Sequence, residues 1–190
     1  MVNVGFIVEG DSEKIVVESE RFGQWLDELG FFRINPVINA KGGGNLLPQN
    51  IGVFLESLQL KGAERIAVIT DLEDEPLVDN VKDRINKDGI DVIFVAVKAL
   101  EAWFLADTEA MRNWLNEPNF FEAEPESTED LPWQRLKCVA NDHGSRGPGS
   151  KPAFAKRITR RHGFDITRSA QHPECPSARE LVDYFNEPEV

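Results

Sequence analysis

The sequence predicts an α/β fold with a four-stranded parallel sheet flanked by helices, for three reasons. Apolar runs over residues 4–8, 65–70 and 90–97 are typical of strands buried on both faces. Segments with helical spacing of apolar residues lie between these runs, as right-handed crossovers require. Acidic residues follow each run, at the edge where open α/β sheets hold ligands. At 190 residues, the chain is long enough for one well-buried core.

The elements of the sheet region follow from apolar periodicity and turn residues. Ser12 can cap a first helix, which Gly30 ends. Pro36 places the second strand at an edge or a bulge. The expected strands cover residues 4–8, 31–39, 65–70 and 90–97, and the expected helices cover residues 12–29, 46–60 and 77–87.

The alternation of strands and helices stops near Thr108. A short helix through Trp114 precedes residues 117–130, which hold six acids and no base, and we expect a mobile surface insertion there. Residues 135–168 carry a local charge of +7, and a last helix covers about residues 177–185. We therefore predict a core over residues 1–107 and a helical extension over residues 108–190, packed on the same domain.

Composition and charge exclude several classes of protein. The net charge of −12 and the pI near 4.7 argue against a protein that coats nucleic acid by charge alone. No apolar run is long enough to span a membrane, and no basic segment precedes the first apolar run, so we expect a cytoplasmic protein. Two cysteines are too few for a disulfide framework.

Carboxylates follow three of the predicted strands. Glu9 follows the first, Asp71 and Glu73 the third, and Glu101 the fourth. Parallel strands would bring these side chains to one edge, where clustered carboxylates need a cation. Oxygen ligands favour Mg²⁺ or Mn²⁺, which can activate water for phosphodiester cleavage. The alternative is that each acid only caps a helix or solvates a turn, and for Asp11 we favour a helix-start charge.

The segments VEGDSE, ITDLED and LEAWFLAD together resemble a Toprim domain, and more specifically uncharacterised Toprim-like proteins related to the nuclease domain of OLD-family proteins. The resemblance covers about residues 3–107 and implies a Rossmann-like Toprim core. It implies that Glu9, Glu13, Asp71 and Glu73 hold metal, and that Glu101 matches the acid after the fourth strand. Glu73 departs from the pattern, since aspartate is more common there.

Basic residues near the C-terminus could bind a phosphate backbone. A basic loop over residues 145–151 precedes a helix in which Phe154 and Ile158 would face the core. The resemblance implies a catalytic lysine after the core strands, for which Lys151 is the best candidate. The predicted substrate-binding residues are Arg146, Lys151, Lys156, Arg157 and Arg160. The alternative is that these charges only solvate a helix.

These observations predict a metal-dependent nuclease or related phosphodiester-processing enzyme, with Glu9, Asp71 and Lys151 as catalytic residues. DNA is favoured over RNA as its partner. By resemblance, a role in phage defence or repair and a separate ATPase partner would follow. One alternative is a phosphatase with Asp71 as nucleophile; another is a non-catalytic cation-binding or signalling module.

The cysteines and two of the histidines allow one more site on paper. Cys138, His143, His172 and Cys175 have the spacing of two zinc half-sites, but neither half lies at a clear knuckle. We therefore expect buried cysteines and surface histidines instead.

Overall fold

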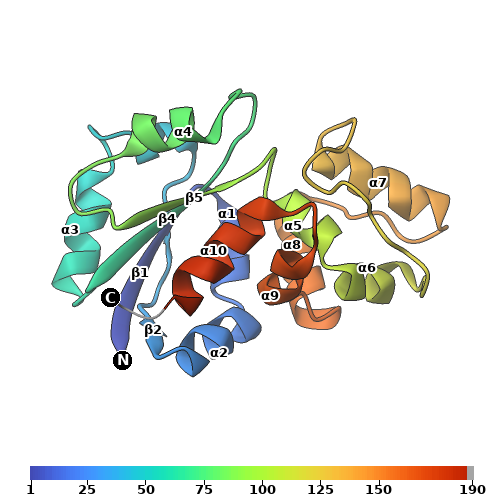
Figure 1. Ribbon diagram of the computed structural model, residues 1–190, viewed down its shortest axis with the longest axis horizontal. Coiled ribbons are helices and arrows are strands. Elements are labelled where there is room, and N and C mark those ends of the chain that lie inside the picture. Colours follow the sequence, from blue (N-terminus) through green and yellow to red (C-terminus); the bar gives the residue numbers. More distant parts are fainter. Residues whose placement is uncertain (188–190) are drawn as a thin grey trace. The chain divides into compact units, whose positions relative to one another are not determined.

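The computed structural model describes residues 1–187 and confirms the predicted α/β class (Figure 1). Its strands are β1 (Val2–Val8), β2 (Phe31–Arg33), β3 (Ile38–Asn39), β4 (Arg65–Asp71) and β5 (Val92–Ala96). The third and fourth predicted strands correspond to β4 and β5, to within two residues at each end.

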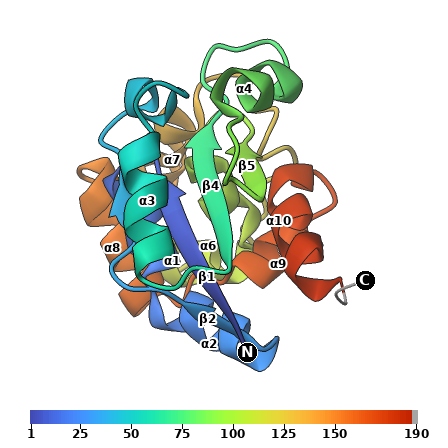
Figure 2. The ribbon, with the colours of Figure 1, turned by 90° about the vertical axis from the view of Figure 1, so that its left-hand side faces the viewer.

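The sheet has the order β2-β1-β4-β5, and β3 also pairs with β1. β1 pairs in parallel with β2, β3 and β4, and Val8 lies opposite both Asn39 and Ile69. β1 and β4 run side by side through the sheet (Figure 2). The end of β1 is therefore enclosed by neighbours, and Glu9 follows it directly.

Two predicted elements are divided. The second strand consists of β2 and β3, separated by a cis Asn35–Pro36 bond, because a proline has no N–H to continue the ladder. The first helix consists of α1 (Asp11–Val17) and α2 (Glu20–Glu28). Ser19 lies between them as the N-cap of α2, where its side chain accepts a hydrogen bond from the Phe22 amide at 3.4 Å.

The predicted helices that start near residues 77, 108, 151 and 177 are present, whereas those that start at Glu101, Pro132 and Ile166 were not predicted. The helix predicted over residues 46–60 starts late, at Gly52, after a short 3-10 helix. The elements are η1 (Gly43–Leu46), α3 (Gly52–Leu60), α4 (Val78–Ile85), α5 (Glu101–Ala106), α6 (Thr108–Leu115), α7 (Pro132–Asp142), α8 (Lys151–Arg161), α9 (Ile166–Gln171) and α10 (Pro176–Asn186).

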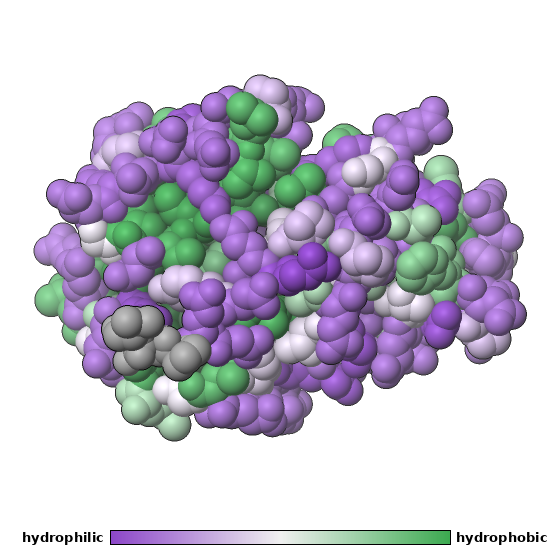
Figure 3. Space-filling model, viewed as in Figure 1, coloured by the Kyte–Doolittle hydropathy of each residue, from purple (hydrophilic) through white to green (hydrophobic). Residues whose placement is uncertain are grey.

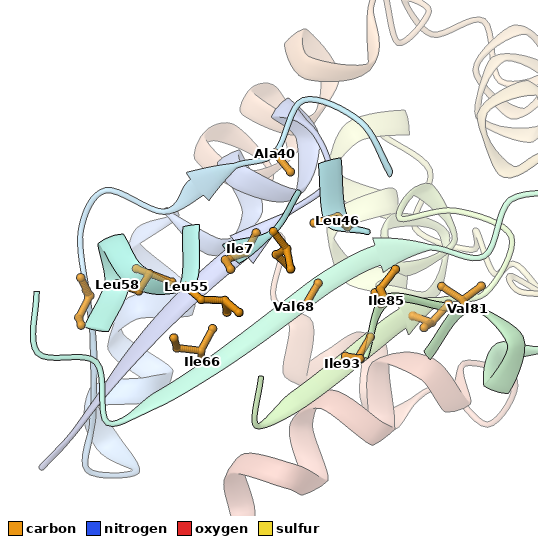
Figure 4. Packing of buried hydrophobic residues seen from close by; sticks show 13 residues of the cluster. Ile7, Ala40, Leu46, Leu55, Leu58, Ile66, Val68, Val81, Ile85 and Ile93 are labelled. Atoms are coloured by element: carbon orange, nitrogen blue, oxygen red, sulfur yellow. The ribbon is translucent and has the colours of Figure 1, made fainter. Parts of the chain in front are cut away.

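Alternate residues of β1 face opposite sides of the sheet. Ile7 belongs to a buried cluster that includes Leu55 and Leu58 of α3 and Val81 of α4 (Figure 4). On the other side, the Phe6 ring meets the Phe22 ring of α2 edge to face, with 5.8 Å between centroids. Burial on both faces holds β1 in place.

The chain divides into two compact units, the first Met1–Val95 and the second beginning at Ala96. In the second unit α5 is buried along its whole length, so Trp103 and Phe104 are core residues. The Phe104 ring lies 5.6 Å from that of Phe154 and 4.9 Å from that of Phe164. The structure thus gives the second unit a core of its own.

Hydrophilic side chains predominate on the face shown in Figure 3. Among the described residues, no helix has the length and apolar character that a membrane span requires.

Candidate metal and phosphate sites

The Glu9 side chain lies against the end of β4. Its Oε2 accepts hydrogen bonds from the Thr70 hydroxyl and, at 3.2 Å, from the Asp71 amide. The Glu9 amide in turn donates to the Ile69 carbonyl at 3.0 Å. Backbone pairing and side-chain hydrogen bonds therefore fix this carboxylate beside Asp71, at the carboxyl ends of two neighbouring parallel strands.

The glycine turn after β3 forms the other wall around Glu9. The Gly42 amide donates to the Glu9 carbonyl at 2.8 Å. A Cβ atom added to Gly43 would lie 3.3 Å from Glu9 Oε1, closer than ordinary van der Waals contact. The turn thus leaves space for the second carboxylate oxygen, which is not engaged by Thr70.

Two further predicted ligands of the first unit are Glu13 and Glu73, and Asp11 was expected to be only a helix-start charge. Glu13 is buried and its Oε2 would lie 3.0 Å from a Cβ atom at Gly10, the N-cap residue of α1. This is the position from which a glutamate in the first turn closes a capping box. Glu73 is exposed in a turn with a φ of 51°. Asp11 is exposed and accepts a hydrogen bond from Asn39 Nδ2 at 2.7 Å.

Glu101 and Lys151 belong to the second unit, where they pair. Lys151 Nζ lies 3.1 Å from Glu101 Oε2. The Glu101 side chain is 2% exposed and that of Lys151 is 46% exposed. Lys151 therefore compensates a buried carboxylate while much of its own side chain is exposed. Both residues were predicted as site residues, but their pairing was not.

The remaining basic residues lie on helix α8 and in the loop that precedes it. Phe154 and Ile158 are buried, as the spacing predicted, while Lys156 and Arg160 are exposed on α8. Arg157 is partly buried, and its Nη2 donates to the carbonyls of Gly147 and Pro148 at 3.1 and 3.2 Å. Arg157 thus holds the loop that leads to Lys151, and Arg146 lies exposed in that loop.

The acidic segment 117–130 was expected to be a mobile surface insertion, and this expectation is wrong. Glu122 pairs with Arg135 at 2.6 Å. Glu126 is 6% exposed and its Oε1 accepts from the Ser177 hydroxyl at 2.5 Å and from the Ser177 amide at 3.0 Å. Burial raises the pKa of the Glu126 carboxyl, which the hydrogen bonds from Ser177 and Cys175 oppose. Buried carboxylates therefore attach this segment to the helices of the second unit.

The cysteines and histidines show no zinc site. The structure contains no group of three or more His, Cys, Asp or Glu residues arranged for a metal ion within residues 1–187. The expected exposures were half wrong, because Cys138 is exposed and His172 is buried. His172 Nδ1 accepts from the Glu174 amide, so Nε2 carries the proton that it donates to the Glu122 carbonyl at 2.8 Å.

Several residues of the site were missed in the sequence. Thr70 donates to a glutamate 61 residues away, which no local pattern could reveal. Gly43 lies in a glycine turn that could be recognised, but its contact with Glu9 depends on β3 pairing with β1. Asp107 was taken only as the end of the LEAWFLAD segment, yet it is fully buried and pairs with Arg168 at 2.8 Å.

The carboxylates of the first unit suit a hard cation. Mg²⁺ commonly takes one or two protein carboxylates and completes its shell with water and substrate phosphates. The Glu9 carboxylate lies beside the backbone amide of Asp71, and the carboxylates of these two residues would suit Mg²⁺ or Mn²⁺ better than a metal that needs a closed protein cage.

Comparison of the chain with protein-family models, with curated proteins and with solved structures found no match.

Proposed function

We propose that this protein is a metal-dependent nuclease or a related phosphodiester-processing enzyme that acts on nucleic acid, DNA in preference to RNA. The observation that carries the proposal is the Glu9 carboxylate, fixed beside Asp71 where β1 and β4 end. Glu9 and Asp71 would hold Mg²⁺ or Mn²⁺, which supplies an activated water and charge stabilisation when bound. Glu13, Glu73 and Glu101 remain proposed metal ligands.

The chain's own residues would orient the reaction. Thr70 and the Asp71 amide hold one oxygen of Glu9, so the carboxylate cannot rotate freely. Lys151 is held by Glu101, and its positive charge would attract a phosphate oxygen. Such fixed donors avoid the cost of reorganisation during the reaction.

The basic residues would hold the nucleic-acid backbone. Lys156, Arg160 and Arg146 are exposed cations in a chain of net charge −12. None of these three forms an ion pair with an acidic residue in the part of the chain that the structure describes. Unpaired cations are available to replace the counterions of a phosphate backbone.

The test is cleavage of single- and double-stranded DNA and RNA with Mg²⁺ or Mn²⁺. Glu9→Gln and Asp71→Asn should each lower the cleavage rate at least about 100-fold. Asp74→Asn is the control, because Asp74 is exposed in the same acidic turn and should leave the rate unchanged. Full activity in both site variants would refute the assignment.

A second candidate, a non-catalytic cation-binding module, is favoured by one observation. Lys151 already compensates the charge of Glu101, one of the predicted metal ligands, which leaves fewer carboxylates for a catalytic metal site. Calorimetric titration with Mn²⁺, together with the cleavage assay, separates the two candidates. The module would be favoured if Mn²⁺ binds, Glu9→Gln abolishes the heat of binding, and no nucleic acid is cleaved.

A further inference from the structure

Three arginines of the second unit gather without acidic partners. Arg157 and Arg161 lie four residues apart on α8, so they share a face of the helix. Arg146 precedes Gly147, whose carbonyl Arg157 binds at 3.1 Å. Within residues 1–187, none of the three guanidinium groups forms an ion pair with an acidic side chain. The cluster is therefore uncompensated.

Arg157 is fixed at the centre of this arginine cluster. Its guanidinium carbon lies 5.5 Å from the Phe154 ring centre and 6.0 Å from that of Trp114. Its Nη2 donates to two carbonyls of the loop, while its Nε is buried without a partner. These contacts hold the guanidinium group of Arg157, and therefore its positive charge, in one position.

The like charges act on one another and on His162. Burial, and after it the charges of Arg146 and Arg161, lower the pKa of Arg157. Burial, followed by the charges of Arg157 and Arg161, lowers the pKa of His162 from its ordinary value of 6.5. A bound anion would relieve this repulsion.

We propose that Arg146, Arg157 and Arg161 form a binding site for one phosphate group, with His162 at its edge. Guanidinium groups match the oxygens of phosphate and can bind them in pairs. Three cations around one group favour the dianion of a phosphate monoester over a singly charged diester. This inference rests on the proposed function, in which the substrate is nucleic acid. The phosphate group that the site binds would then be the one at the phosphorylated end of a nucleic-acid strand.

The first test uses inorganic phosphate alone, without metal and without turnover. The pKa of His162, followed by NMR and assigned with His162→Gln, should rise toward 6.5 as phosphate binds, because a nearby anion stabilises the imidazolium. Arg161→Gln, at an exposed position that should fold normally, should weaken phosphate binding about tenfold. Lys137→Gln, an exposed cation on α7, is the matched control and should bind as the wild type does.

The second test measures the binding of two pairs of oligonucleotides of one sequence. The members of the first pair differ in having a phosphate or a hydroxyl at the 5′ end, and those of the second pair differ in the same way at the 3′ end. In one of the two pairs, the phosphorylated strand should bind about tenfold more tightly than the strand with a hydroxyl. Arg161→Gln should remove this difference in affinity. Equal affinity of all strands would refute the end-phosphate assignment, and an unchanged His162 pKa at saturating phosphate would refute the site. Neither result depends on cleavage, so failure of the nuclease proposal remains a separate outcome.

Discussion

Gly43 controls how much space the Glu9 carboxylate has. An alanine there would bring its Cβ to 3.3 Å from Glu9 Oε1, and Gly43 has no positive φ that would strain the backbone. We expect Gly43→Ala to weaken Mn²⁺ binding and nuclease activity about tenfold by displacing the carboxylate, with little change in stability. Calorimetric titration and cleavage rates measure both effects.

The matched control for this prediction is the next residue. Gly44→Ala makes the same change of side chain, but no atom lies within 4 Å of the added Cβ. Equal losses in the two variants would show that the turn tolerates no side chain at all, and that the Glu9 contact is not the cause.

Glu126 should make stability depend on pH. Its raised pKa means that the folded state holds a proton more tightly than the unfolded chain, so stability falls as pH rises above the ordinary value of 4.5. Glu126→Gln keeps the acceptor oxygen and removes the charge, so this decline in unfolding free energy should disappear. Denaturant unfolding of both proteins from about pH 4.5 upward measures it.

The control for Glu126 removes the acceptor as well. Glu126→Ala leaves the Ser177 amide and hydroxyl without their partner and should cost about 2 kcal/mol of unfolding free energy. A pH-dependent decline that persists in Glu126→Gln would assign it to another group.

At the residue scale, the sequence located the ends of the strands and therefore predicted where Glu9 and Asp71 lie. It could not predict the side-chain contacts around them. Thr70, Gly43 and the pairing of Glu101 with Lys151 depend on which distant segments the fold brings together, and no periodicity carries that information.

At the scale of elements, Asp107 joins the starts of two helices. It is the N-cap residue of α6, where its Oδ1 accepts from the Ala110 amide at 3.1 Å. Its Oδ2 accepts from the Asp165 amide at the start of α9, at 2.8 Å. Arg168 binds both oxygens at 2.8 Å. One buried carboxylate thus satisfies donors from two elements.

We expect Asp107→Ala to lower the unfolding free energy by about 3 kcal/mol, because it leaves the Arg168 charge and two amides without their acceptor. Glu109→Gln is the control, since Glu109 is mostly exposed and lies 3.7 Å from Arg168; its effect should stay within about 0.5 kcal/mol. Thermal and denaturant unfolding of the purified variants measure both, and equal effects would contradict the central role of Asp107.

The elements themselves were largely predictable, because buried strands and amphipathic helices have clear periods. The exceptions have local causes. Ser19 starts a new helix within a continuous apolar pattern, and Pro36 interrupts the pairing of a strand that reads as one run. The acidic segment was wrongly expected to be mobile, because its composition gives no sign that Glu126 is buried and bound to Ser177.

At the scale of the whole molecule, the charge is unevenly distributed along the chain. Binding of duplex DNA should weaken as salt rises, with a slope of log K against log salt no steeper than about −4.5 if all five predicted cations contact phosphates. Lys156→Ala should reduce that slope by about 1. Fluorescence anisotropy over a salt series measures it, and a slope near zero would exclude a phosphate-binding role for these residues.

The central position of β1 has a consequence for synthesis. This strand is synthesised before every other strand of the sheet, and its partners extend to Asp71 at the end of β4. Its apolar side chains, Phe6 and Ile7 among them, therefore have no complete sheet to join until β4 has emerged. We expect the nascent first unit to need protection by chaperones during that interval, and its folding to be completed late in its translation.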